Sequence, residues 1–411
     1  MARGNDQGLS DGAGHGAPAR EDPLEIPEQE PRMTRSEERG HAPVPAGDDE
    51  EMPRMVLTRR QIVASLLFVV FGVGFLYFVL PRLTGIGTTV HRIERGNPWW
   101  IGIGVLLEML SFGGYIVVFR AVFVPGTNGR IDWAASYQIT MAGLVATRLF
   151  AAAGAGGIAL TAWALRRSGM EARLVACRMV AFTVLLYVVY AGSLLIAGVG
   201  LATGAFPGGG SFAITVVPAL VAFLLFVGAG LLALLPDDLS RRLERRAEGS
   251  GRLARWTARA ATVPALTASG VRTAVALVRT RDPKLLGVIA WWGFDIAVLW
   301  AMFHAFGTPP PFTVIWMAYF VGTLGNLLPL PGGLGGVEGG MIGAFAAFGV
   351  DVNLAVLAVL SYRGISFWLP TIPGAIAFFQ LRHTVAGWRE EDAGARPAPG
   401  AIAHAAAVHG S

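Results

Sequence analysis

The sequence predicts an all-α polytopic membrane protein with about six full spans, two re-entrant helical hairpins and a possible inverted repeat. Three observations carry this prediction. Hydrophobic residues make up 53% of the 411-residue chain and charged residues only 15%, and the apolar residues come in long blocks. Two of these blocks are too long for one span and are interrupted by glycine. The basic excess behind the net charge of +5 lies mostly between blocks, as membrane topology requires.

The two ends of the chain are polar and low in apolar residues. Residues 1–57 mix acidic and basic residues with many Pro and Gly, so they cannot bury enough surface to fold, and we expect a disordered cytoplasmic tail. Residues 391–411 have the same character and the same expectation. The segment between them, 58–390, is the predicted membrane domain.

Six apolar runs are long enough to cross a bilayer as helices. They lie at approximately 61–80, 99–120, 172–203, 211–235, 285–306 and 354–380. Blocks 133–165 and 312–349 differ, because glycines break each of them in the middle. Main chain without helical hydrogen bonds is tolerated at membrane depth only inside protein or beside a wet cavity. We therefore interpret both blocks as re-entrant hairpins.

Charge asymmetry orients the chain in its membrane, which we expect to be the cell (plasma) membrane of a bacterium. The segment 236–284 holds ten Arg and Lys284 against five acids, and the positive-inside rule then places both termini in the cytoplasm. The loop 81–98, with three arginines, is an exception to this assignment. Helical spacing of apolar residues in 236–284 indicates an amphipathic helix on anionic lipid, or otherwise a solvated basic loop.

This arrangement divides the membrane domain into two halves of similar plan, about 58–203 and 211–385, each with two spans, a broken hairpin and a long span. Glu108 and Asp295 fall at corresponding mid-span positions. Many transporters build a midplane site from inverted repeats with discontinuous helices. The sequence therefore favours a transport function.

Proline and glycine define the two hairpin breaks. In the second hairpin the predicted break comprises Pro329, Pro331, Gly332, Gly333, Gly335 and Gly336, and in the first it comprises Gly154, Gly156 and Gly157. Such residues let half-helices end and approach closely. An acid, Glu338, follows two residues after the second break.

Five charged residues lie in apolar surroundings: Glu108, Arg148, Asp295, Glu338 and Arg363. An ionisable residue within the membrane is by default a functional candidate, so Glu338 is either a headgroup or proton contact, or a structural acid that accepts from main-chain amides. Arg363 requires a carboxylate or a phosphate, and Glu338 or Asp295 is the expected protein partner. A permanent internal ion pair is the alternative. Arg148 is a candidate phosphate contact, and Glu108 needs a partner or a proton.

Several function classes lack support in the sequence. Cys177 is the single cysteine, and the seven histidines are scattered, so we expect no metal site. The chain contains no Gly-x-x-x-x-Gly-Lys-Ser/Thr loop, and we expect no nucleotide or other cofactor. The basic residues are interpreted as topology signals and not as a nucleic-acid surface.

The residues of the last quarter resemble one known family. Pro331-Gly332-Gly333, Gly336 and Glu338, followed by Tyr362-Arg363 in the next span, resemble the membrane region of lysylphosphatidylglycerol synthases, a family that includes stand-alone flippase-like proteins. The resemblance implies a bundle with two re-entrant hairpins that moves a modified phospholipid or another lipid-linked headgroup between leaflets. It also brings Tyr362 into the candidate substrate path.

Two departures from the family limit what the resemblance implies. No soluble aminoacyl-transferase domain is recognisable, so we expect no synthesis of lysylphosphatidylglycerol. The first hairpin, "FAAAGAGG", lacks the proline and the acid of the second. The leading prediction is a lipid translocase driven by downhill flux or by a proton coupled through Glu338, Glu108 or Asp295. The alternatives are a lipid-modifying transferase and a non-transporting structural subunit of an envelope-lipid pathway; the oligomeric state is left open.

Overall fold

The computed structural model describes residues 96–234 apart from 126, 128 and 150–154, and residues 267–394 apart from 329–332. All of them belong to one compact unit, Glu51–Ser411. Several predictions fall outside the described residues: the tail 1–57, the span 61–80, most of the loop 236–284, and the hairpin residues Gly154, Pro329, Pro331 and Gly332.

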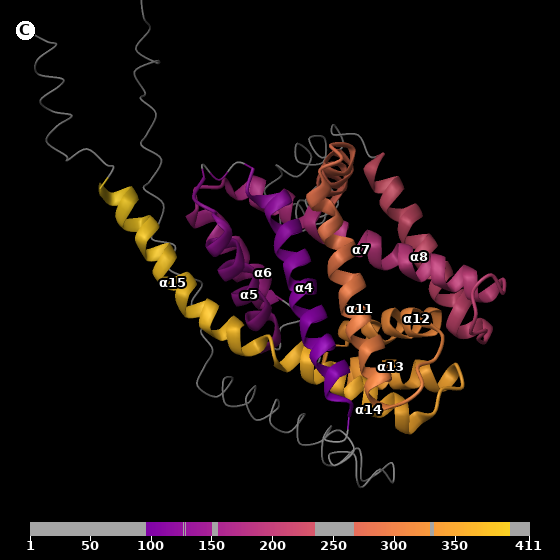
Figure 1. The fold of residues 1–411 in the computed structure, drawn as a ribbon. Coiled ribbons are helices and arrows are strands. Elements are labelled where there is room, and N and C mark those ends of the chain that lie inside the picture. The colour runs from indigo at the N-terminus through magenta and orange to yellow at the C-terminus, as the bar shows by residue number, and fades with distance from the viewer. Residues whose placement is uncertain are drawn as a thin grey trace, which may run out of the picture. The chain divides into compact units, whose positions relative to one another are not determined.

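Every regular element among the described residues is helical, which confirms the predicted all-α class (Figure 1). The helices are α4 (Pro98–Phe123), α5 (Trp133–Leu149), α6 (Ala155–Arg167), α7 (Ala172–Ala202), α8 (Phe212–Ala233), α11 (Gly287–Phe306), α12 (Phe312–Thr323), α13 (Gly336–Ala347), α14 (Val352–Arg363) and α15 (Thr371–Gly394). Residues 267–279 are also helical. Helix α15 continues past residue 391, so the predicted C-terminal tail begins within a helix.

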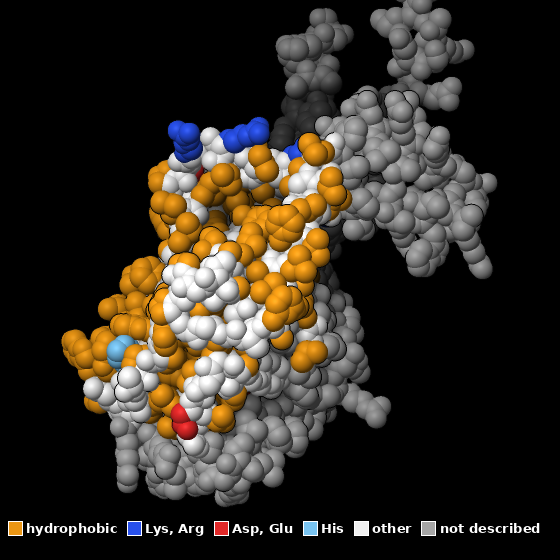
Figure 2. Space-filling model, turned by 90° about the vertical axis from the view of Figure 1, so that its right-hand side faces the viewer, with side chains coloured by type: hydrophobic (Ala, Val, Ile, Leu, Met, Phe, Trp, Pro, Cys, Tyr) orange, Lys and Arg blue, Asp and Glu red, His pale blue; other side chains and the backbone are white. Residues whose placement is uncertain are grey.

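Within the described parts of the chain, five helical stretches are long and apolar enough to cross a membrane. They are Pro98–Phe123, Ala172–Ala202, Phe212–Ala233, Pro283–Phe306 and Val352–Glu391, and they coincide with five of the six predicted spans. The face on which α8 lies carries hydrophobic side chains over most of its described surface, with Lys and Arg at one edge (Figure 2). This surface suits contact with lipid.

The two glycine-broken blocks each fold as a pair of helices packed against each other: α5 with α6, and α12 with α13. The main chains approach closely at glycine in both pairs. A Cβ on Gly157 would lie 2.4 Å from the carbonyl oxygen of Gly143, and a Cβ on Gly336, the first residue of α13, would lie 2.8 Å from that of Gly325, in the 3-10 turn that follows α12. The glycines of the predicted breaks thus serve close helix packing, as small residues do in membranes.

The predicted last span, 354–380, is interrupted near its centre. Helix α14 leads into a π-helical turn, Gly364–Trp368, and α15 begins after Pro370. The N–H of Leu369 donates to the carbonyl oxygen of Gly364, five residues earlier, at 3.1 Å. Pro370 explains the break, because it has no N–H with which to continue the helix.

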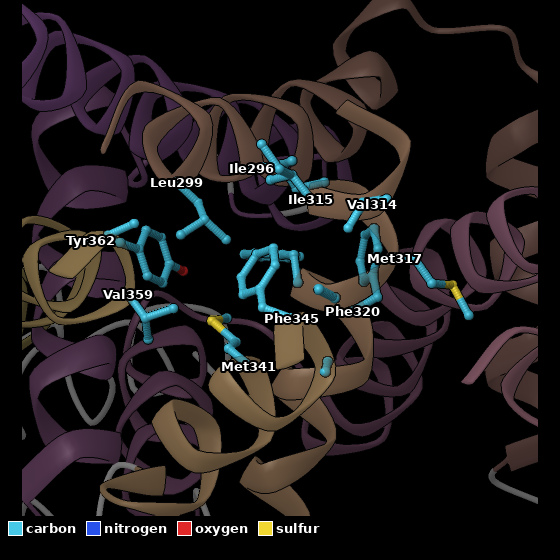
Figure 3. Packing of buried hydrophobic residues seen from close by; sticks show 14 of the residues in the cluster. Ile296, Leu299, Val314, Ile315, Met317, Phe320, Met341, Phe345, Val359 and Tyr362 are labelled. Atoms are coloured by element: carbon cyan, nitrogen blue, oxygen red, sulfur yellow. The ribbon is translucent and has the colours of Figure 1, made fainter. Parts of the chain in front are cut away.

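Helices α4 and α11 form the central contact of the fold. Ser111 Oγ donates to the carbonyl oxygen of Trp291 at 2.9 Å, and a Cβ on Gly114 would lie 2.8 Å from the carbonyl oxygen of Gly287. Higher numbers on α4 therefore meet lower numbers on α11, so the two helices run antiparallel. One side of α11 packs into a hydrophobic core shared with α12, α13 and α14, which Figure 3 shows around Leu299, Phe320 and Phe345.

The crossing of α4 and α11 gives a stability prediction. Gly114→Ala places a methyl group against α11 main chain and should lower the free energy of unfolding by roughly 1–3 kcal/mol, the usual cost of overpacking. Gly113→Ala, one residue away, meets nothing within 4 Å and should be neutral or stabilising, because Ala favours helix over Gly. Thermal unfolding in detergent measures both variants, and equal melting temperatures would contradict the close approach.

Candidate functional site

Five charged residues from separate helices meet inside the membrane domain. We call them, with two tyrosines and the ring that links them, the buried polar cluster: Glu108, Arg148, Asp295, Tyr319, Glu338, Tyr362, Arg363 and Phe367. The five helices that supply its charges are α4, α5, α11, α13 and α14. The structure thus brings together all six residues of the predicted substrate path.

Glu338 and Arg363 form a buried ion pair. Arg363 Nε donates to Glu338 Oε1 at 2.7 Å, and the Glu338 side chain is 1% exposed. The second oxygen of Glu338 accepts from the main-chain N–H of Gly335 at 2.7 Å. Glu338 is the third residue of α13 and Gly335 its N-cap, so the acid also satisfies an N–H left free at the helix start. Glu338 thus accepts from a main-chain amide and forms an internal ion pair with Arg363. These are the two structural roles that the sequence allows for these residues.

Glycine is required just before this acid. Gly333 and Gly335 have φ of 66° and 83°, in the left-handed region that other residues rarely adopt. A Cβ on Gly333 would also lie 2.2 Å from Asn326 Oδ1. The two glycines therefore allow the chain to turn directly into α13 and to set Glu338 at its N-terminus.

Arg148, near the end of α5, binds the break before α15. Its Nη2 donates to the carbonyl oxygen of Ser366 at 2.8 Å and its Nη1 to Thr371 Oγ1 at 3.1 Å. Nη1 also donates to the carbonyl oxygen of Phe367. In an α-helix the Ser366 carbonyl would accept from residue 370, which is proline and has no N–H. Arg148 supplies the missing donor, and this links the first helix pair to the last span.

Phe367 connects the two arginines. The guanidinium carbons of Arg148 and Arg363 each lie 4.6 Å from the centroid of its ring, within the range of cation–π attraction. The Phe367 ring and the oxygen acceptors of the two arginines therefore hold two cations close together. Sequence reasoning missed Phe367, because an aromatic residue in an apolar span carries no signal of such a role.

Asp295 and Glu108 complete the cluster from the central helix pair. Asp295 Oδ2 accepts from Tyr362 Oη at 3.0 Å and from Tyr319 Oη. Glu108 is 4% exposed, and its carboxyl group interacts with that of Asp295 and with the charge of Arg148. Arg363 is thus paired with Glu338, whereas Asp295 accepts hydrogen bonds from the two tyrosine hydroxyls. The sequence had left both acids open as the partner of Arg363, and it did not single out Tyr319.

Comparison with known proteins identifies the family of the chain. Residues 62–374, well over half of the chain, match the family described as "Lysylphosphatidylglycerol synthase TM region". The chain belongs to this family. Membership makes it a multi-pass integral membrane protein and confirms the resemblance found in the sequence, and the match covers every residue of the buried polar cluster.

Curated relatives of this lysylphosphatidylglycerol synthase membrane-region protein come from Methanothermobacter thermautotrophicus. One "UPF0104 membrane protein" is 25% identical over 342 residues, which cover 78% of this chain and 93% of the relative. A second protein with the same description is 38% identical over 93 residues, which cover 22% of this chain and 28% of that relative. A third is 37% identical over 87 residues, with 21% and 26% covered.

The ion pair gives a second stability prediction. Glu338→Gln or Arg363→Gln alone leaves one buried charge without its partner, and each should lower the free energy of unfolding by roughly 3–5 kcal/mol. The double variant removes both charges and should lose clearly less than the sum of the two. Thermal unfolding of the four proteins in detergent measures the difference, and additive losses would contradict a direct interaction.

Proposed function

We propose that this protein moves a phosphate-bearing lipid headgroup between membrane leaflets. One observation carries the proposal: Arg148 and Arg363, from the two halves of the chain, lie against the same ring in the membrane interior. Guanidinium groups bind phosphate through charge-assisted hydrogen bonds. The acyl chains would remain in lipid, beside apolar surfaces such as that of α8.

The way Arg148 is held supports an anion site. Its hydrogen-bond acceptors, Ser366 O, Phe367 O and Thr371 Oγ1, are all neutral. A phosphate oxygen offers a charged acceptor, which forms stronger hydrogen bonds than a carbonyl or hydroxyl oxygen. Arg148 can therefore exchange a neutral acceptor for a phosphate with a gain, whereas Arg363 already binds the carboxylate of Glu338. In this proposal Glu338 positions Arg363.

Helix lengths support re-entrant hairpins. Helices α12 and α13 have 12 residues each, or about 18 Å at the rise of an α-helix, and α6 has 13 residues. The hydrocarbon core is about 30 Å thick, so none of these helices crosses it alone. Each pair would enter and leave on one side, with its broken tip inside the membrane.

The packing between the halves supports an inverted repeat. The last span of the first half, α7, packs against α12 of the second helix pair, and α15 packs against α5 of the first pair. The second spans of the two halves, α4 and α11, cross antiparallel, with Glu108 and Asp295 at corresponding positions. A pseudo-two-fold axis in the membrane plane would relate these contacts, as in transporters with alternating access. Both termini would then be cytoplasmic, and segment 236–284 would lie on anionic lipid.

Leaflet exchange in proteoliposomes tests the proposal. With fluorescent phospholipids of several headgroups, Arg148→Gln should slow exchange by at least tenfold, roughly the loss expected from one charged hydrogen bond. Arg178→Gln is the matched control, because Arg178 also donates to main-chain oxygens, those of Phe123 and Pro125, but lies outside the cluster. Exchange in that control should stay near the wild-type rate.

The outcomes separate lipid translocation from a purely structural role. Equal exchange by wild type and Arg148→Gln, with both proteins folded, would contradict the headgroup site. No exchange of any offered phospholipid, together with full cellular function of Glu338→Gln and Arg148→Gln, would favour the structural subunit. In that case the ion pair and the Arg148 hydrogen bonds serve packing alone.

A further inference from the structure

Two buried carboxyl oxygens of the cluster have no hydrogen-bond partner among the described residues: Glu108 Oε2 and Asp295 Oδ1. Glu108 as a whole is 96% buried, being 4% exposed. An unsatisfied carboxyl oxygen away from water costs free energy, more so when it is charged. These two atoms therefore need either a donor or a proton.

The packing of α4 on α11 places the two carboxyl groups together. On one side of Glu108, a Cβ on Gly104 would lie 3.8 Å from Val298 Cγ1. On the other side, Ser111 Oγ binds the Trp291 carbonyl. In this antiparallel register Glu108 stands at the level of Asp295, so that each carboxyl group lies within the electrostatic influence of the other. Neither carboxylate has an N–H or O–H to offer the other.

The groups around the pair leave an excess of negative charge. Facing Glu108 are Asp295 from α11 and Arg148 from α5. Facing Asp295 are Glu108, Arg363 and the hydroxyls of Tyr319 and Tyr362. Since Glu338 is bound to Arg363, full ionisation would set three carboxylates against two guanidinium groups. Two like charges in contact at low dielectric repel strongly.

We infer that Glu108 and Asp295 share one bound proton. The proton sits on an oxygen of one carboxyl group and is donated in a hydrogen bond to an oxygen of the other. One proton satisfies both unpartnered atoms, replaces a repulsion by an attraction and makes the five charged groups neutral together. The two tyrosine hydroxyls, which donate to Asp295 Oδ2, leave Oδ1 for this hydrogen bond.

The same geometry decides between the three acids that could carry a coupling proton. Glu338 has one oxygen on Arg363 and the other on the N–H of Gly335, so its ionised form is fully satisfied. A proton on Glu338 would break these contacts, whereas a proton between Glu108 and Asp295 makes one. Among the described residues no three acids, histidines or cysteines are arranged to hold a metal ion. A proton, in contrast to a metal ion, can be held between two carboxyl oxygens.

A consequence for transport rests on the proposed function. A lipid phosphate at Arg148 and Arg363 would take up positive charge that otherwise balances the carboxyl groups. Its binding would favour a second proton on the pair, and proton binding would favour the lipid by the same factor. The pair would then couple headgroup movement to a proton.

Infrared spectroscopy of the full-length protein in lipid tests the inference without any transport measurement. At neutral pH the wild type should show the C=O stretching band of a protonated carboxylic acid, shifted in D₂O. Glu108→Gln and Asp295→Asn should each lose this band, because two carboxylates then face two guanidinium groups. Arg148→Gln should keep or increase it. Glu171→Gln changes an exposed carboxyl group and should leave the buried band unaltered.

Labelling guards against variants that do not fold. In the wild type alone, a ¹³C label in the carboxyl group that carries the proton, that of aspartate or of glutamate, should shift the band. A ¹³C label in the other residue type should perturb the band only slightly, because that carboxylate accepts the hydrogen bond. A wild type without the band, or a band that survives in either single variant, would overturn the inference. A band that behaves as expected beside a protein that exchanges no lipid would instead count against the proposed function.

Discussion

The membrane interior requires each buried charge to find its partner within the protein, and the arrangement of this fold follows from that requirement. Arg363 on α14 binds Glu338 at the start of α13, which ties the second helix pair to the last span. Arg148 on α5 binds main-chain oxygens of the same span. The charges therefore hold together segments whose apolar surfaces alone would pack in many ways.

Main-chain breaks and charged side chains are complementary here. Pro370 leaves the Ser366 carbonyl without an intrahelical donor, and Arg148 supplies one. The start of α13 leaves the N–H of Gly335 free, and Glu338 accepts from it. At these two helix ends a main-chain group left free is thus matched by a side chain of suitable sign.

Sequence reasoning located the spans and the charged residues but not most of their contacts. Hydropathy finds helices of the length of α7 or α11 because lipid sets their length and composition. The need of Arg363 for a carboxylate was also evident, yet the choice of Glu338 over Asp295 depends on how α13 meets α14. The acceptors of Arg148 are main-chain atoms, and such atoms leave no mark in a residue pattern. The π-helical turn could not be predicted either, because it is defined by main-chain hydrogen bonds, and hydropathy does not change when a turn holds one additional residue.

The π-helical turn at Gly364–Trp368 gives α15 a way to rotate about its own axis relative to α14. A π turn holds one residue more than an α turn, so its conversion to α-helix would rotate everything after it by about 100° and advance it by about 1.5 Å. The 24 residues of α15 would rotate as one rigid helix. The oxygens that accept hydrogen bonds from Arg148 lie at or just before its N-terminus. A rotation at this turn would in this way be transmitted to the C-terminal end of α15, or be imposed from there.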